Sequence, residues 1–363
     1  MTTLQKPPEL DPAITEAFAD RMLGVVNGAC TALMSSIGHQ TGLFDTLAGR
    51  PPSTSPEIAA AAALDERYVR EWLNAMTTAR VVVHDPATST YALPAEHAAW
   101  LTDAAGPDKL ARLTTVISML AEVEQGIVGC FREGGGLSYA DFERFHELMA
   151  ADSRAVVDAT LLDVVVPHIE GLAAGLRDGI DVADIGCGSG HAINVLAAAY
   201  PNSRFVGYDF GEEAIAAARA EAVELELTNA RFELRDVATL DEVAAYDLVT
   251  AFDAIHDQAQ PALVLAAISR ALRDHGTFLL VDIKASSNVE DNLEHPMGAF
   301  LYTVSTMHCM TVSLGQGGVG LGTAWGEQLA TAMLRDAGFT TIDLAPVEAD
   351  PFNNYYVCRR GGG

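Results

Sequence analysis

The pattern of apolar and polar residues changes character near residue 181. Before that point apolar residues recur mostly at helical spacing, and after it short apolar runs alternate with amphipathic stretches. This alternation is typical of parallel strands joined by helices that cover both faces of a sheet. We therefore expect an α/β chain in which a Rossmann-like, mostly parallel sheet follows a mostly helical region.

The pattern also predicts the individual elements of the C-terminal part. Strands are expected at Val182–Ile185, Arg204–Asp209, Ala230–Arg235, Tyr246–Phe252, Thr277–Ile283, Thr341–Leu344 and Tyr355–Arg359. Helices are expected at Ala192–Ala199, Glu212–Leu227, Pro261–Leu272 and Trp325–Ala337. Residues 288–322 are an insertion too long for a simple turn, and we expect a lid or a substrate wall there.

The N-terminal part predicts a helix-turn-helix followed by a β-wing, that is, an α-rich winged-helix domain. Ser55 is expected to cap a first helix that has Pro56 in its first turn. A second helix is expected at 66–80, and two short strands at 81–83 and 91–93 form the wing. The apolar face of the second helix is expected to hold Tyr68, Val69, Trp72, Leu73 and Met76. We divide the chain into residues 1–103, a helical connector 104–175, and a C-terminal domain 176–360.

Composition and charge narrow the classes of function. The 363 residues are 49% hydrophobic and carry a net charge of −27. So negative a chain repels phosphate backbones and anionic membranes, which argues against a nucleic-acid substrate. The five cysteines form no CxxC pair, and His308-Cys309 lacks further ligands at a known spacing, so we expect reduced thiols and no metal. Without a signal-peptide pattern in residues 1–12 or a long apolar run, we expect a cytoplasmic protein.

One loop carries most of the functional information. The apolar strand at 182–185 runs into Gly186, Gly188 and Gly190, and a helix follows. Glycine at alternate positions lets the backbone approach a ligand closely, and the helix N-terminus offers free N–H groups. Asp209 ends the second strand, where it can accept both hydroxyls of a ribose, and Asp236 follows the third. The alternative is that each acid is simply a polar residue at the end of a strand.

Together these motifs resemble those of the class I S-adenosylmethionine-dependent methyltransferases, to whose signature the sequence DIGCGSG is close. The resemblance implies that Gly186, Gly188 and Gly190 line the methionine and ribose of the cofactor. It implies Asp209 at the ribose, Asp236 at the adenine and Asp184 near the methionine amino group. Further cofactor contacts are expected at Phe210, Val237 and Phe252. A dinucleotide-binding dehydrogenase prefers GxGxxG, but His191 stands at the last position here.

The segment after the fourth strand resembles plant-type O-methyltransferases, in which a histidine of a His-Asp pair is the general base. His256 and Asp257 match that pair. Gln258 replaces the tryptophan common after it, and Phe252 replaces a lysine that contacts the cofactor. Histidine can take a proton from a hydroxyl near neutral pH, although packing at a turn is the alternative role. Asp282 and Glu327 are candidates for orienting it, and each is equally readable as a structural acid.

The N-terminal domain resembles that of plant-type and actinobacterial O-methyltransferases, where it dimerises. The main hypothesis is a methyltransferase that acts on a hydroxyl of a small, aromatic or lipophilic acceptor, as a homodimer. Transfer to carbon or nitrogen is an alternative. A DNA-binding regulator that senses the cofactor and a catalytically silent dimerisation partner are the others. Phe145 and Met149, ahead of the first strand, are candidates for stacking near the cofactor, with core packing as the favoured alternative, and Tyr139 and His146 are weaker pocket candidates.

Overall fold

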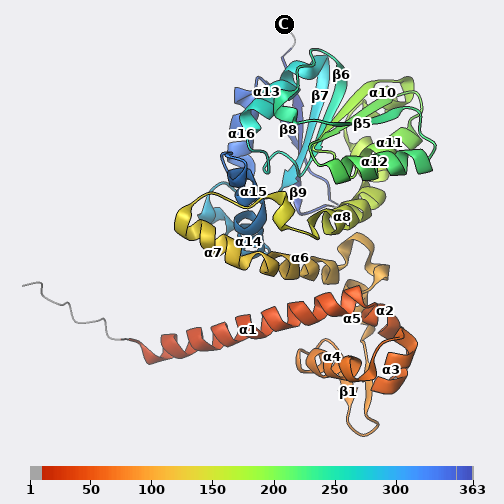
Figure 1. The fold of residues 1–363 in the computed structure, drawn as a ribbon, viewed down its shortest axis with the longest axis vertical. Coiled ribbons are helices and arrows are strands. Elements are labelled where there is room, and N and C mark those ends of the chain that lie inside the picture. Colours follow the sequence, from red (N-terminus) through yellow and green to blue (C-terminus); the bar gives the residue numbers. More distant parts are fainter. Residues whose placement is uncertain (1–9, 349, 362–363) are drawn as a thin grey trace, which may run out of the picture. The chain divides into compact units, whose positions relative to one another are not determined.

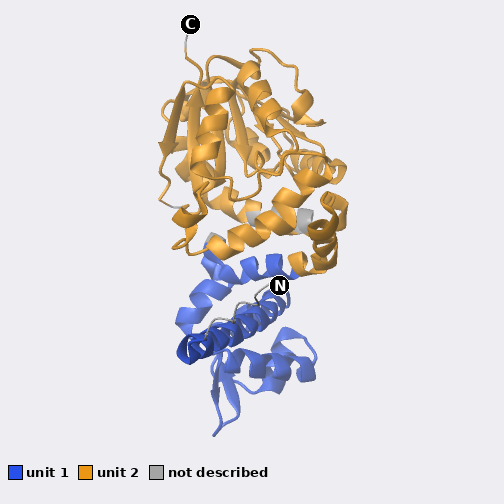
Figure 2. Ribbon diagram, turned by 90° about the vertical axis from the view of Figure 1, so that its left-hand side faces the viewer, with its two compact units in different colours: residues 1–118 blue, residues 119–363 orange. Residues whose placement is uncertain are grey.

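The computed structural model describes residues 10–348 and 350–361, except the side chains of 107, 145–147, 149, 151 and 152. The chain forms two compact units, residues 1–118 and 119–363 (Figure 2). No single helix in the described ranges is long and apolar enough to cross a membrane. Two sharply bent helix pairs, Leu110–Glu122 with Glu124–Glu133 and Ser153–His168 with Leu172–Asp178, reach that length and composition only together.

The N-terminal unit is a helical domain with a two-stranded antiparallel wing. Its elements are α1 (Pro12–Gln40), α2 (Leu43–Leu47), α3 (Ser55–Ala62), α4 (Glu66–Thr78), β1 (Val83–Asp85), β2 (Thr90–Ala92), α5 (Ala95–Leu101), η1 (Asp103–Asp108) and the start of α6 (Leu110–Glu122). The helices α3 and α4 and the hairpin β1–β2 confirm the predicted helix-turn-helix and wing (Figure 1).

Two local predictions in this unit are wrong. The cap of α3 is Thr54, whose backbone N–H donates to Glu57 Oε2 at 2.8 Å, so Ser55 is already the first helical residue. This is a capping box, which the acid three residues after Thr54 signals better than the serine does. Tyr68 is 81% exposed, whereas the other four residues of the predicted face are buried. At about 100° per residue, Tyr68 lies roughly 90° from the centre of that buried stripe.

The C-terminal unit is a seven-stranded sheet with helices on both faces (Figure 1). Its strands are β3 (Asp181–Ile185), β4 (Arg204–Asp209), β5 (Ala230–Leu234), β6 (Tyr246–Phe252), β7 (Leu272–Ile283), β8 (Thr341–Ala345) and β9 (Asn353–Arg359). The order is β5-β4-β3-β6-β7-β9-β8, with the first five parallel and β9 antiparallel to both neighbours. The predicted Rossmann-like fold is confirmed.

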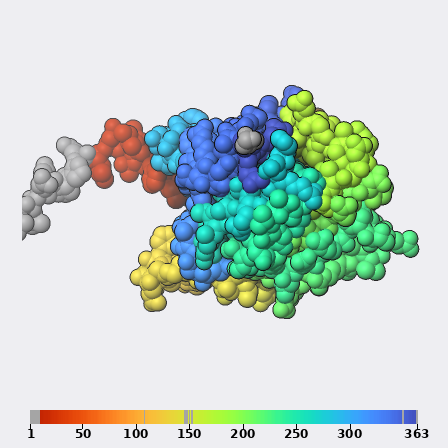
Figure 3. Space-filling model, turned by 90° about the horizontal axis from the view of Figure 1, so that it is seen from above, coloured from red at the N-terminus to blue at the C-terminus, as the bar shows by residue number. Residues whose placement is uncertain are grey.

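Two apolar layers hold the helices to this sheet. One layer packs beneath α13 (Pro261–Ala271) and α16 (Gly326–Asp336). The other packs beneath α11 (His191–Ala199) and α12 (Glu212–Glu224) and beneath the helical run that precedes β3. The part of that run that contributes to the layer is the end of α8 (Phe145–Thr160), η3 (Leu161–Val165), α9 (Val166–His168) and α10 (Leu172–Asp178). Ahead of it lie α7 (Glu124–Glu133) and η2 (Tyr139–Asp141). In the space-filling view the segments coloured green to blue form one continuous surface (Figure 3).

The sheet places its functional edge where the strand order reverses, next to β3. From β3 the chain proceeds to β4 on one side and later returns as β6 on the other, and ligands of open α/β sheets bind at such a reversal. The insertion after β7 is largely helical. It contains η5 (Val289–Asn292), α14 (Gly298–Val304), η6 (Ser305–Cys309) and α15 (Met310–Gly315). A short 3-10 turn, η4 (Val237–Thr239), follows β5.

Candidate active site

The loop after β3 folds tightly around its three glycines. Gly186, Gly188 and Gly190 have φ of +69°, +52° and +71°, a backbone conformation that residues other than glycine rarely adopt. A Cβ on Gly186 would stand 2.6 Å from Ala254 Cβ, and one on Gly190 would stand 2.4 Å from the Phe232 ring. A Cβ on Gly188 would meet nothing within 4 Å. Gly188 is therefore the glycine at which the loop faces open space.

These differences predict unequal effects of alanine on stability. Gly190→Ala should lower the free energy of unfolding by about 2–4 kcal/mol, because overlap with Phe232 adds to the backbone strain. Gly188→Ala carries only the strain, about 1–2 kcal/mol. Urea denaturation of both variants measures the difference. Equal losses would show that the loop relaxes and that the packing at Gly190 is not limiting.

Asp209 connects the glycine loop to the end of β4. Its Oδ2 accepts a hydrogen bond from the N–H of Gly188 at 2.9 Å, and its Oδ1 accepts one from the N–H of Gly211 at 2.8 Å. A carboxylate has about four acceptor sites, so two remain for a ligand. Phe210, the next residue, is 46% exposed. The acid is thus held rigidly beside the open side of the loop.

Asp184 is a buried carboxyl group inside the sheet. It lies opposite Thr250 of β6, whose hydroxyl donates to Asp184 Oδ1 at 2.7 Å. Burial raises the pKa of Asp184 to about 7; the Thr250 hydroxyl opposes this rise, and the nearby Asp209 adds to it. An acid so placed is half ionised near neutrality and is sensitive to any cation that approaches.

The other predicted cofactor residues are less tightly organised. Asp236 is exposed, and its carboxylate accepts the N–H of Ala238 at 2.9 Å as the cap of η4. Val237 is buried in the core, and Phe252 packs partly buried against the apolar layer under α11. The side chains of Phe145, His146 and Met149 lie outside the described residues.

His256 is the centre of a buried polar cluster at the end of β6. Its Nδ1 lies 2.8 Å from Asp282 Oδ1, and its Nε2 lies 3.2 Å from Asp257 Oδ1. An ionised carboxylate only accepts, so the contact with Asp282 fixes the proton on Nδ1. Burial acts to lower the pKa of His256, but Asp282 and Asp257 raise it, and the net direction is well above its ordinary value. The predicted candidates His256, Asp257 and Asp282 therefore lie together.

Asp282, rather than Glu327, contacts the histidine. Its Oδ1 also accepts from the indole N–H of Trp325 at 3.1 Å and from its neighbour's N–H, whereas Glu327 is exposed in the first turn of α16. Trp325 was not among the predicted site residues. Its only sequence signal is its place beside Glu327, one residue before α16.

Two further groups reach the cluster from other segments. Tyr139 donates its hydroxyl to Asp257 Oδ2 at 3.2 Å. One atom each of His256, Asp257 and Cys309 lies within 4.8 Å of the others, and Cys309 accepts from the hydroxyl of Thr323 at 3.0 Å. From the sequence, Cys309 was expected only as part of the insertion at residues 288–322, which was predicted to be a lid or a wall of the substrate site. Its position beside the histidine depends on how η6 folds back onto the sheet.

Comparison with known families assigns both parts of the chain. Residues 29–103 match a family described as an Rv2258c-like winged HTH domain, and residues 176–338 match one described as a methyltransferase domain. A trans-aconitate 2-methyltransferase of Methylobacterium nodulans is 32% identical over 157 residues, 43% of this chain and 53% of the relative. The chain thus spans about half the length of this relative.

Solved structures share the whole architecture. Human N-acetylserotonin methyltransferase, in complex with S-adenosylmethionine, superposes with a TM-score of 0.67 at 16% identity, covering 98% of this chain and 100% of the other. An O-methyltransferase family protein from Burkholderia thailandensis has a TM-score of 0.68 at 15% identity, covering 98% and 100%. At such identities the likeness shows that the fold is shared.

Proposed function

Because this chain joins a winged helix-turn-helix domain to an S-adenosylmethionine-dependent methyltransferase domain of the class I fold, we propose that it methylates a hydroxyl oxygen of a small molecule, with His256 as general base. The observation that carries the proposal is the contact of His256 Nδ1 with the buried carboxylate of Asp282. This contact leaves Nε2 as the nitrogen that takes a proton. A histidine held in this way is the arrangement that base catalysis requires.

The residues of the loop fit the cofactor. Asp209 has acceptor sites left for the ribose hydroxyls, and Gly188 presents no side chain on the open side. Asp184 is placed to attract the methionine ammonium group, and Asp236 is exposed and able to accept from the adenine amine. We assign Gly186 and Gly190 to the shape of the loop, because alanine at either position collides with its neighbours.

The chain's own contribution to the reaction is orientation and proton transfer. When bound, S-adenosylmethionine supplies an electrophilic methyl group on its sulfonium. The carbon–sulfur bond of that methyl group would break as the acceptor oxygen bonds to the carbon, which leaves a neutral thioether. Nε2 of His256 would take the proton from the acceptor hydroxyl. The positive charge that appears on the imidazole is stabilised by Asp282 at Nδ1 and by Asp257 beside Nε2. Such a base contributes ~10²–10⁴-fold to the rate.

The raised pKa of Asp184 gives cofactor binding a pH dependence. Only the ionised carboxylate attracts an ammonium group, so affinity for S-adenosylhomocysteine should be full above pH 7. It should fall about tenfold for each pH unit below the pKa, which is about 7. Titration calorimetry at pH 6, 7 and 8 measures this slope. Asp184→Asn should bind weakly at every pH with no slope, and a slope that persists in this variant would assign it to another group.

We place the acceptor near a group of aromatic rings. Phe142 and Tyr139 pack edge-on against His308, with ring centroids 4.7 and 5.5 Å apart. Tyr139 joins this group of rings to Asp257 through its hydroxyl. Apolar ring surface beside the proposed base favours an aromatic or lipophilic acceptor. A carboxylate acceptor, like that named for the trans-aconitate relative, needs no base. Carbon and nitrogen acceptors remain alternatives.

The direct test is transfer of a labelled methyl group from S-adenosylmethionine to phenols, carboxylic acids, amines and activated carbon acids. Labelled ethers from phenols or alcohols that depend on His256 would support the proposal. Labelled esters, amines or carbon-methylated products in place of ethers would overturn the oxygen assignment.

We also propose that α1 mediates dimerisation. From Pro12 to Cys30 every residue of this helix is exposed, including Ile14, Phe18, Met22 and Val26. Burial of such side chains against a second copy is worth about 25 cal/mol for each Å² removed from water. Sedimentation velocity should show a dimer that Phe18→Asp with Val26→Asp converts to monomer. A monomeric wild-type chain would contradict the proposal.

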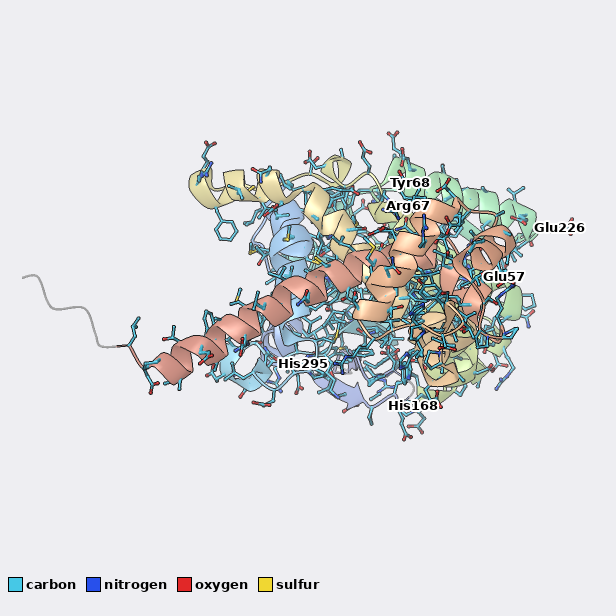
Figure 4. The ribbon with its side chains drawn as sticks, turned by 90° about the horizontal axis from the view of Figure 1, so that it is seen from below. Glu57, Arg67, Tyr68, His168, Glu226 and His295 are labelled. Atoms are coloured by element: carbon cyan, nitrogen blue, oxygen red, sulfur yellow. The ribbon has the colours of Figure 1, made fainter. Side chains whose placement is uncertain are left out.

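The charges of the winged-helix domain favour dimerisation over DNA binding. On α4 the basic residues are paired with acids one turn away, Arg67 with Glu71 and Arg70 with Glu66. Arg67 and Tyr68 are labelled in Figure 4. A helix that enters a major groove needs a net positive face, and these pairs leave α4 without one. Retardation of mixed duplex DNA at low salt would reverse this assignment.

A further inference from the structure

Tyr139 is held at the site by a segment with little freedom. A Cβ on Gly136 would stand 1.9 Å from the carbonyl oxygen of Thr311, so this stretch of backbone packs directly on α15. The N–H of Leu137 donates to the hydroxyl of Thr311 at 3.0 Å. On the other side Ser138 and Asp141 form a capping box around η2. The tyrosine therefore projects from a fixed point.

The Tyr139 ring lies between the end of β4 and the insertion at residues 288–322. It packs edge-on against Phe210, the residue after Asp209, with centroids 5.4 Å apart. On another side it packs against His308, with centroids 5.5 Å apart. Its hydroxyl donates to Asp257 Oδ2 at 3.2 Å. The ring contacts fix the direction in which the hydroxyl points.

Asp257 connects this hydroxyl to the base. While Oδ2 accepts from Tyr139, Oδ1 lies 3.2 Å from His256 Nε2, and its side chain is 14% exposed. The carboxylate thus lies at the boundary of the cluster and solvent. Without a fixed donor on Oδ2, it could turn toward water and away from the imidazole.

We propose that Tyr139 is a positioning residue that holds the carboxylate of Asp257 against Nε2 of His256 and thereby sets how strongly the histidine retains its proton. The role of the histidine as base rests on the proposed function, but its protonation does not. Burial and the charge of Asp257 are the leading influences that raise the pKa of the Tyr139 phenol, so the hydroxyl stays a donor throughout the working range.

Several other groups influence the imidazole. Asp282 of β7 lies at Nδ1, Cys309 of η6 lies close to the ring, and Asp253, directly after β6, interacts with it electrostatically. His308, next to Cys309, packs against the Tyr139 ring. None of these groups changes in a Tyr139→Phe variant, which removes one oxygen and keeps the ring. That variant removes the hydroxyl that donates to Asp257 and leaves the ring contacts in place.

The test is an NMR titration of His256 in the full chain without cofactor. Protein labelled at histidine Cε1 has ten histidines, and His256→Asn assigns the signal. Asp257→Asn should lower the pKa of His256 by about 1–3 units, the usual effect of one adjacent charge. Tyr139→Phe should lower it by about 0.5–1 unit, and it should have no effect in the Asp257→Asn background.

Tyr355→Phe is the matched control. It also removes a phenol that donates to a carboxylate, Asp350 Oδ2 at 2.8 Å. Among the described residues that pair has no hydrogen bond or ion pair with His256, and its electrostatic influence reaches the cluster through Asp253. Its His256 titration should equal that of the wild type. An unchanged or raised His256 pKa in Tyr139→Phe, or the same shift in Tyr355→Phe or in the Asp257→Asn background, would overturn the proposal. Because the titration needs no acceptor, its result is independent of whether the chain methylates oxygen.

Discussion

Asp209→Ala is expected to weaken binding of S-adenosylhomocysteine by at least about 100-fold. The substitution removes the acceptor that we propose for two ribose hydroxyls, and each hydrogen bond to a charged group is worth about 1.5–3 kcal/mol. It also removes the acceptor of the Gly188 and Gly211 N–H groups, so the loop is joined to β4 only by the N–H groups of Gly186 and Cys187, which donate to the Tyr208 carbonyl. Titration calorimetry measures the affinity, and the unfolding midpoint in urea reports how much of the loss is structural.

Asp236→Ala is the comparison for this result. Asp236 is exposed, and within the described residues its carboxylate accepts only the N–H of Ala238, so its loss should cost about tenfold or less. If Asp209→Ala bound with wild-type affinity, the ribose assignment would be wrong. If Asp236→Ala had the larger effect, the two acids would need to exchange roles.

His256→Ala is expected to reduce methyl transfer to a hydroxyl acceptor by ~10²–10⁴-fold while affinity for S-adenosylhomocysteine stays unchanged. The pKa of His256 lies well above its ordinary value, so the basic form grows as pH rises. The wild-type rate should therefore climb with pH and level off once the imidazole is neutral. The variant should lack this rise, which single-turnover rates across the pH range will show.

Asp282→Asn separates orientation from proton transfer. The asparagine keeps the size of the side chain but loses the charge that fixes the proton on Nδ1, so the rate should fall while the histidine remains. Full activity of His256→Ala on the same acceptor would mean that no base is needed. If His256→Ala lost affinity for S-adenosylhomocysteine as strongly as it lost rate, the substitution would have disrupted the site as a whole.

The sequence could predict those parts of the site that are local in the chain. The glycine loop, Asp209 and the His256-Asp257 pair each follow a strand directly, and parallel strands bring such ends to one edge. Asp282 was predictable as a candidate because it lies in the next strand. The choice between Asp282 and Glu327 was not, because it depends on which face of α16 turns toward the sheet.

Contacts between distant segments could not be predicted. Tyr139 and Asp257 are 118 residues apart, and only the packing of η2 against the insertion brings them together. The same holds for Trp325 and Asp282, which are 43 residues apart. In the N-terminal unit, Tyr68 fits a helical apolar pattern by composition, yet its place at the edge of the stripe leaves it exposed. The pattern of residue types predicts that a helix or strand forms. The contacts of its side chains can be predicted only when its orientation in the fold is known.

The close approach of Gly136 to α15 has a consequence for how this protein can change over evolution. A Cβ there would stand 1.9 Å from Thr311 and 2.4 Å from the backbone of Gly315, so the two segments can shift only as one body. Substitutions in the insertion that admit a different acceptor would therefore also move the segment that carries Tyr139. New acceptors would then require matching changes on both sides of Gly136, and a chimaera that exchanges the insertion alone should lose its fit to Asp257.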